Sequence, residues 1–258
     1  MKLSFITEQI DKTLLRQILD CSSQVTAEML FLEMAVLPIR FIILLRRLTY
    51  FQHILKQRKK NSLVFQFLKA QEKFPKKNDW FSQVLSDLKE LDIKMSQEEI
   101  EEMSSTKFKT LCKMRVKDLA FKYLQEKKEK HQAVKDIIYN KYEMADYLKE
   151  GEHEISVQER QYLFQCRMKD IDAHAHRTWK YKDIFCISCE DRNTIEDIIH
   201  ILDCKTLLNR NKYLTYLPTE SDLYSSNIEE QIYASFIIRE NMHIRESLRK
   251  QRLVAHVN

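Results

Sequence analysis

Three cysteines and one histidine in the C-terminal third of the chain have the types and the spacing of a metal site. They are Cys186, Cys189, His200 and Cys204, in the pattern C-x2-C-x10-H-x3-C. A tight turn can direct the first two thiolates to one point, and residues four apart on an expected helix, His200 and Cys204, share a face. Three sulfurs and one imidazole complete a tetrahedral shell with no open position. The spacing therefore predicts structural Zn²⁺ rather than a catalytic metal.

Other interpretations of this segment stay open. The four residues could be unrelated members of a helical core. His174 and His176 could replace a ligand, although a basic surface linker is their simpler interpretation. Glu196 precedes His200 by one turn and could support the site from behind, or be a solvated helix residue. The other cysteines lie in helical apolar patterns and are expected to be small buried side chains: Cys21, Cys112 and Cys166.

A second candidate site is a basic segment. Between Pro38 and Lys60 the chain holds seven Lys or Arg residues and no Asp or Glu, with aromatic residues between them. Such a segment can follow phosphates with its cations while its rings stack or pack; the alternative is a solvated helix face with the aromatic side chains in the core. The linker before the cysteines adds three more candidates. We predict that the following residues contact RNA or DNA without strong sequence preference: Arg40, Arg46, Arg47, Arg58, Arg177, Trp179 and Lys180.

Catalytic constellations are weaker. The chain has one glycine, Gly151, where average usage would be about 7%, so glycine-rich phosphate loops and the GxSxG nucleophile elbow are excluded. Two groups of ionisable residues remain, Asp170 with Asp172 and the triplet at positions 152–154. Three consecutive side chains do not converge on one point, which favours a solvated turn over acid–base chemistry. We expect that this chain is not an enzyme.

Helical patterns must position these residues. The sequence predicts a mainly α fold, a helical array with a small C-terminal zinc-binding module, and three regions at 1–150, 151–205 and 206–258. Serine–glutamate pairs at 96 and 99 and at 156 and 159 predict capping boxes, and Pro38 suits the first turn of a helix. The clearest expected helices span 4–24, 26–33, 38–59, 79–91, 106–130 and 228–254.

Length, charge and cysteine usage bound the class of protein. The chain has 258 residues, a net charge of +5 and a pI near 8.7. Its first residues do not predict a signal peptide, and six cysteines without one favour a reducing compartment. The apolar run from Met29 to Leu45 carries Glu33 and Arg40, which a membrane span would bury at high cost. We expect an intracellular protein, nuclear or cytoplasmic, that is not secreted and does not enter a membrane.

Three segments of the chain resemble non-LTR retrotransposon reverse transcriptases. The run LFLEMAVLPIRFIILLRRLTYFQHIL at 30–55 is similar to the helix in or after the thumb of those proteins. The run CISCEDRNTIEDIIHILDC at 186–204 is similar to their C-terminal zinc-binding domain, whose ligands correspond to the four residues named above. The run FPKKNDWFSQVLSDL at 74–88 resembles their linker. The resemblance covers about residues 26–205 and implies contacts to template RNA and to primer or target DNA.

The departure from that family is as informative as the likeness. The chain contains no Asp-Asp dipeptide, so the polymerase palm signature is missing and the two-metal chemistry with it. The resemblance implies a thumb- and linker-like region over 1–150, the zinc-binding region over 151–205 and a helical tail, without polymerase activity. The upstream polymerase portion of the same element is then a possible partner. The alternative function is a helical protein-interaction scaffold held by structural zinc, whose last helix could dimerise.

Overall fold

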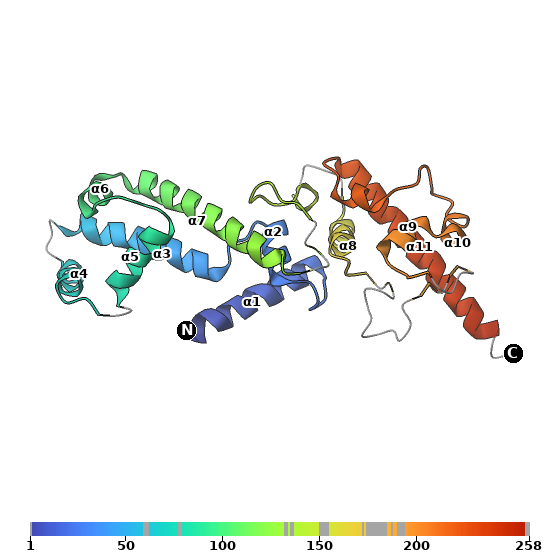
Figure 1. The fold of residues 1–258 in the computed structure, drawn as a ribbon, viewed down its shortest axis with the longest axis horizontal. Coiled ribbons are helices and arrows are strands. Elements are labelled where there is room, and N and C mark those ends of the chain that lie inside the picture. The colour runs from blue at the N-terminus through green and yellow to red at the C-terminus, as the bar shows by residue number, and fades with distance from the viewer. Residues whose placement is uncertain are drawn as a thin grey trace.

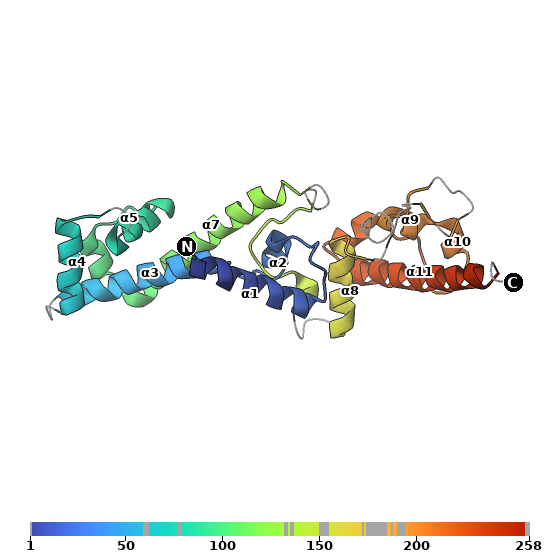
Figure 2. The ribbon, with the colours of Figure 1, turned by 90° about the horizontal axis from the view of Figure 1, so that it is seen from below.

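The computed structural model is an elongated array of helices (Figure 1). It describes residues 2–58, 62–76, 79–131, 134, 137–149, 155–171, 173, 185–186, 188–189 and 194–255. Helices α3 to α7 form one end of the molecule, and α9 to α11 form the other, with α1, α2 and α8 between them. The view turned by 90° shows the same order along the long axis (Figure 2).

The mainly α prediction is confirmed. In the described parts of the chain the extended structure is limited to one isolated bridge, Phe185 to Ile195. The helices and 3-10 turns are α1 Lys2–Leu19, α2 Ala27–Glu33, α3 Ile39–Lys56, α4 Leu63–Lys73, α5 Trp80–Glu90, α6 Gln97–Glu102, α7 Ser105–Lys128, η2 Asp146–Leu148, α8 Val157–Arg167, α9 Ile198–Asp203, α10 Lys205–Leu208, η4 Glu220–Tyr224 and α11 Ile228–Ala255.

The helix ends follow local chemistry. Ser96 and Ser156 form the predicted capping boxes at the starts of α6 and α8. Pro38 is the N-cap of α3, one residue before the position we expected. The first helix is shorter than the predicted 4–24, because the chain turns at Asp20, which has a φ of 48° in the left-handed region.

Two apolar cores lie along the molecule, and α7 contributes to both. Its buried side chains recur every four residues from Phe108 to Lys128. Four residues turn an α-helix by about 400°, so this stripe winds around α7 by about 40° per step. Phe108 to Ala120 therefore face the core built with α3 to α6, whereas Leu124 reaches the core built with α1, α2, α8, α9 and α11. That larger core draws on residues on both sides of positions 150 and 205.

A buried carboxylate joins four segments of the larger core. Glu33 is fully buried at the end of α2. Its carboxylate accepts hydrogen bonds from the hydroxyls of Tyr139 at 2.5 Å and Tyr147 at 2.7 Å, and it pairs with Arg167 of α8 at 3.1 Å. Arg167 also donates to the carbonyl of Leu223. A buried charge needs such partners, because an uncompensated one would be strongly destabilising.

The apolar run from Met29 to Leu45 is divided between α2 and α3, which pack in the two cores. None of the helices in the described residues is both long enough and apolar enough to cross a bilayer. The charge at Glu33 is thus accommodated by protein partners.

Candidate metal centre and nucleic-acid interface

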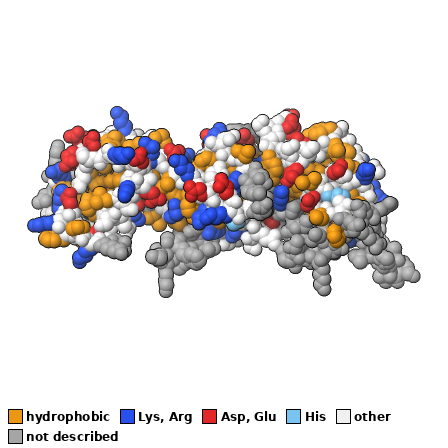
Figure 3. Space-filling model, viewed as in Figure 1, with side chains coloured by type: hydrophobic (Ala, Val, Ile, Leu, Met, Phe, Trp, Pro, Cys, Tyr) orange, Lys and Arg blue, Asp and Glu red, His pale blue; other side chains and the backbone are white. Residues whose placement is uncertain are grey.

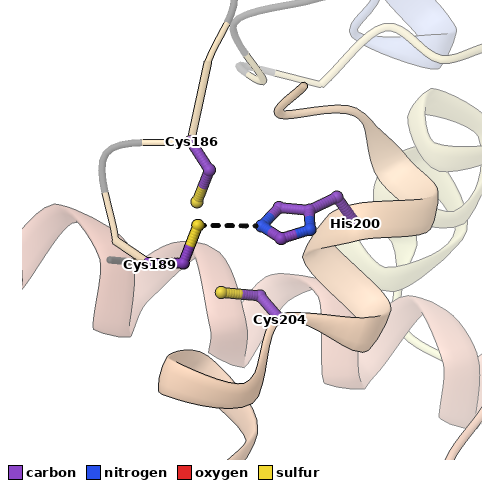
Figure 4. A group of neighbouring side chains, drawn as sticks. All are labelled: Cys186, Cys189, His200 and Cys204. Carbon is purple, nitrogen blue, oxygen red and sulfur yellow. Dashed lines mark hydrogen bonds between the residues drawn. The ribbon is translucent and has the colours of Figure 1, made fainter. Parts of the chain in front are cut away.

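The four predicted ligands come together from two short elements. The bridge between Phe185 and Ile195 and a hydrogen bond from the Cys186 N–H to the Thr194 carbonyl, 2.8 Å, hold the first cysteine pair beside the start of α9. Asp197 caps α9 by accepting from the His200 N–H at 2.8 Å. Cys204 lies between the end of α9 and the start of α10, and its Sγ points into the space that the other two thiols and the His200 ring also face (Figure 4).

The geometry of these four side chains fits one metal ion (Figure 4). The three Sγ atoms and an imidazole nitrogen all lie within 4.8 Å of one another, and Cys189 Sγ lies 3.6 Å from His200 Nε2. A tetrahedral ion with bonds of about 2.3 Å to sulfur and about 2.0 Å to nitrogen separates its ligand atoms by about 3.5 to 3.8 Å. The cluster is therefore a Cys₃His group that could hold a metal ion, and the prediction that these residues converge is confirmed.

Hydrogen bonds already favour a thiolate in this cluster. The pKa of Cys186 is lowered, first by a hydrogen bond with Cys204 and then by the backbone N–H groups of Cys189 and Ser188, the latter 3.3 Å from Cys186 Sγ. The pKa of Cys204 is raised, because Cys186 and burial both favour its neutral thiol. Two neighbouring thiols sharing one proton are a ready site for a cation, which displaces the remaining proton.

The three cysteines outside the cluster all have raised pKa values, unlike Cys186. Burial raises the pKa of Cys21 and of Cys112 to about 12, and raises that of Cys166 further. Cys112 and Cys166 are fully buried in the two cores. These thiols stay protonated and act as small apolar side chains, as their helical pattern indicated.

A second buried ion pair ties the candidate metal centre to α11. Glu196 is fully buried and pairs with Arg245 of α11 at 2.7 Å. Asn241 donates to the carbonyl of Ile201 in α9 at 2.8 Å. Leu248 packs in one small cluster with two of the ligand cysteines. The interpretation of Glu196 as a solvated helix residue is wrong, because its side chain is fully buried. Its partner lies 49 positions later in the chain, so no local sequence pattern indicates the pair.

The structure separates the four predicted arginines of α3. Arg47 is half-buried and pairs with Asp87 of α5 at 2.8 Å. Arg58 lies 3.8 Å from Glu98 and 3.6 Å from Glu101, acids of the region around α6. Arg40 and Arg46 are exposed, and neither has an acidic partner among the residues that the structure describes.

Asp87 explains why Arg47 differs from the others. Burial raises the pKa of the Asp87 carboxyl to about 6, while Arg47 opposes the shift. At neutral pH the carboxylate is ionised and cancels the charge of Arg47. Arg47 thus fixes α3 to α5, and its guanidinium is less accessible to a phosphate than sequence alone indicated.

Several sequence-predicted residues lie outside the described residues. These are Arg177, Trp179, Lys180, His174, His176, Asp172 and the triplet at 152–154. Asp170 is buried and accepts hydrogen bonds from Ser22, through the backbone N–H at 2.7 Å and the hydroxyl at 2.6 Å. It joins the turn after α8 to the segment after α1, which is a structural role.

Comparisons with models of protein families, with curated proteins and with solved structures found no match for this chain.

Proposed function

We propose that this chain is a nucleic-acid-binding protein whose C-terminal region is stabilised by structural Zn²⁺. The proposed contacts to RNA or DNA lie on α3 and α7. The proposed Zn²⁺ organises α9, α10 and α11, and takes no part in a reaction. The proposed role is binding, and the chain contains no polymerase signature of its own.

Zinc is the proposed ion because of the ligand chemistry. Three thiolates and one imidazole are soft to borderline ligands, which select Zn²⁺ over Mg²⁺, Ca²⁺ or Mn²⁺. All four positions of a tetrahedral shell are supplied by protein, as in structural sites. When bound, the ion would neutralise the thiolates and cross-link the turn at 186–189 to α9.

The main observation in support of nucleic-acid binding is a pair of positive charges, one on α3 and one on α7, that lie beside the same aromatic ring. The guanidinium of Arg40 on α3 lies 3.9 Å from the ring centroid of Tyr123 on α7. The ammonium group of Lys127 lies 5.6 Å from the same centroid. No acidic partner of either cation is found in the described part of the chain. Two cations beside one ring repel each other, and a polyanion on this surface would relieve that repulsion.

The surface of α7 extends this positive charge. The helix has eight Lys or Arg residues and two acidic ones along 24 residues. Six of its basic side chains are exposed: Lys107, Lys109, Lys113, Arg115, Lys117 and Lys122. Because the buried stripe winds around α7, these cations follow several sides of the helix, which suits a flexible or curved backbone of phosphates more than one flat partner.

The resemblance to non-LTR retrotransposon reverse transcriptases gives this proposal a context. In that context the chain would bind template RNA and primer or target DNA beside a separate polymerase portion of the same element. The likeness rests on the Pro-Ile-Arg segment, the linker-like segment and the cysteine–histidine spacing. Cooperation with a polymerase portion remains a prediction.

One observation favours the alternative, a protein-interaction scaffold. Helix α4 exposes Leu63, Val64 and Phe67, with 82%, 44% and 63% of their surface accessible. Orange hydrophobic side chains also surface in several places at this end of the molecule (Figure 3). Exposed apolar side chains on one helix can mark a protein-binding face.

Salt dependence separates the two functions. We expect the logarithm of the affinity for an RNA or DNA oligonucleotide to fall steeply with the logarithm of salt concentration, by about 0.7 to 0.9 per phosphate contacted. An Arg40→Glu, Lys127→Glu variant should weaken RNA and DNA binding alike and reduce this slope, since phosphate contacts carry no base information. Fluorescence anisotropy at several salt concentrations measures both.

The matched control is Lys141→Glu, which makes the same kind of charge change at an exposed lysine that pairs with Glu143. It should leave affinity and slope nearly unchanged. Arg47→Glu is unsuitable, because it would place two carboxylates together at Asp87. A flat salt response, or full binding by the double variant, would reject nucleic-acid binding by α3 and α7 and leave the scaffold.

A further inference from the structure

The exposed face of α3 carries aromatic rings as well as arginines. Tyr50 leaves 49% of its surface exposed, and His53, one turn later, is exposed too. Their rings lie nearly parallel, 6.1 Å apart between centroids and 19° between planes. Trp80, the first residue of α5, meets Tyr50 edge-on at 6.0 Å. Two helices therefore bring three rings to one place on the surface.

One of these rings, Trp80, packs on the apolar core beneath the surface. The ring of Trp80 packs against Phe51, which is fully buried, with 6.3 Å between centroids. Phe51 in turn contacts Phe81 of α5 at 6.1 Å. The ion pair described above fixes α3 to α5 beside this contact. The position of the Trp80 ring is thus set before any partner binds, and Tyr50 contacts its edge, which lowers the entropic cost of binding.

The charges around the rings select a partner. Helix α3 contains no Asp or Glu, and exposed Arg46 lies one turn before Tyr50 on the same side of the helix. Tyr50 and His53 are exposed and Trp80 is half-buried, and the acids of α5 near them are already engaged: Asp79 caps the helix and Asp87 pairs with Arg47. Rings beside an exposed arginine complement a ligand that has flat faces and negative charge. Single-stranded RNA or DNA has both, because its unpaired bases expose their π faces and its phosphates lie one nucleotide apart.

We propose that Tyr50, His53 and Trp80 form a stacking platform for unpaired bases, with Arg46 contacting the adjacent phosphate. The inference rests on the proposed function and adds which form of nucleic acid this surface selects. A duplex offers its phosphates to the arginines of α3, but its bases are already stacked on one another. The platform therefore favours single strands over duplexes, whereas the cations of α3 and α7 do not distinguish them.

The test compares one oligonucleotide as a single strand and as a duplex, with the whole chain and fluorescence anisotropy. Stacking of one base on an aromatic side chain stabilises a complex enough for Tyr50→Ala to weaken single-strand binding about 5- to 150-fold. Duplex binding should change less than about twofold. Tyr50→Phe, which keeps the ring, should restore single-strand binding.

A matched control lies near the other end of the molecule. Tyr216 is 45% exposed and stacks on Tyr233 at 4.4 Å between centroids, so Tyr216→Ala removes an equally exposed, stacked ring. It should leave both affinities unchanged. Equal single-strand affinity of Tyr50→Ala and the unsubstituted chain would overturn the platform while leaving the proposed function intact. Absence of binding to both oligonucleotides would overturn the proposed function itself.

Tryptophan fluorescence gives a readout that does not depend on how well Tyr50→Ala folds. The chain has two tryptophans, so in a Trp179→Phe chain all tryptophan emission comes from Trp80. Titration with the single strand should quench this emission, and the duplex should not. If the Trp179→Phe chain binds the single strand without any change in Trp80 emission, the bases do not stack at this surface and the inference fails.

Discussion

The two ends of the molecule use charge in opposite ways. At the end formed by α3 to α7 the interior is apolar, and most of the charged side chains lie on the surface. From the middle of the molecule, where α2 and α8 lie, to the other end at α9 to α11, charges and thiols lie inside: Glu33 with Arg167, Glu196 with Arg245, and the Cys₃His group. The first arrangement leaves cations accessible to a partner. The second uses ionic and ligand groups to hold short helices together.

The difference has a physical reason in the length of the elements. Helices α3 and α7 have 18 and 24 residues and bury long apolar stripes against each other. Helices α9 and α10 have six and four residues, too few to be stable by themselves in water. Such short helices need specific links. The buried pair of Glu196 with Arg245 and the hydrogen bond from Asn241 to Ile201 supply two of them, and the Cys₃His group could supply a third by holding a metal ion. The comparison predicts that the two ends respond differently to the same kinds of change.

Loss of the metal site should have the largest effect. Purified chain should contain about one equivalent of zinc, and Cys189→Ser should lose it, because ligand binding and folding are coupled in such sites. Hydrogen exchange should accelerate in α9, α10 and the half of α11 that contacts them. The amides of α3 and α7 should keep their protection, since their core shares no residue with the cluster.

Cys21→Ser is the control for this change, because it removes a thiol whose raised pKa keeps it protonated. It should retain the metal. Stoichiometric zinc in a Cys186→Ser, Cys189→Ser double variant would refute the ligand assignment, and equal loss of protection at both ends would refute the separation between them.

Breaking the buried pair on α11 should rank second. Arg245→Met leaves the carboxylate of Glu196 buried without its partner, which should cost about 3 to 5 kcal/mol in the free energy of unfolding. Arg249→Met is the matched control, since Arg249 lies one turn later, is 42% exposed on its side chain and pairs with Glu246 at 3.7 Å. Denaturant unfolding of both variants measures the contrast; equal small effects would show that the pair at 196 and 245 contributes little.

Removing an exposed charge from the other end should have the smallest effect. Arg58 makes long ion pairs, 3.8 Å and 3.6 Å, and half of its side chain is exposed. Exposed pairs of this kind contribute about 0 to 1 kcal/mol, so Arg58→Ala should unfold at nearly the same temperature as the unsubstituted chain. A loss of stability as large as that caused by Arg245→Met would contradict the interpretation that the charges at this end lie on the surface and contribute little to folding.

Most helices could be predicted because their signals are local. Capping boxes at Ser96 and Ser156 and the apolar spacing of α3 depend on residues within one or two turns. The residues of the candidate metal centre were also predictable, since three cysteines and one histidine with this spacing lie within 19 positions of the sequence. The end of α1 differs from the prediction, because the residue in the left-handed region there is Asp20, whereas the usual sequence signal for such a position is a glycine.

The sequence by itself determined the helical class, the four residues of the Cys₃His group and the concentration of cations in α3. Only the tertiary structure decided which charges face inward. In the sequence Glu33 is a lone acid in an apolar run and Glu196 is followed directly by Asp197, and neither context indicates burial. Their partners Arg167 and Arg245 lie 134 and 49 positions away. Likewise Arg47 and Arg46 are adjacent in sequence, yet one pairs with Asp87 and the other stays exposed. The environment of an ionised group depends on what packs over it, and that is fixed by contacts between distant segments.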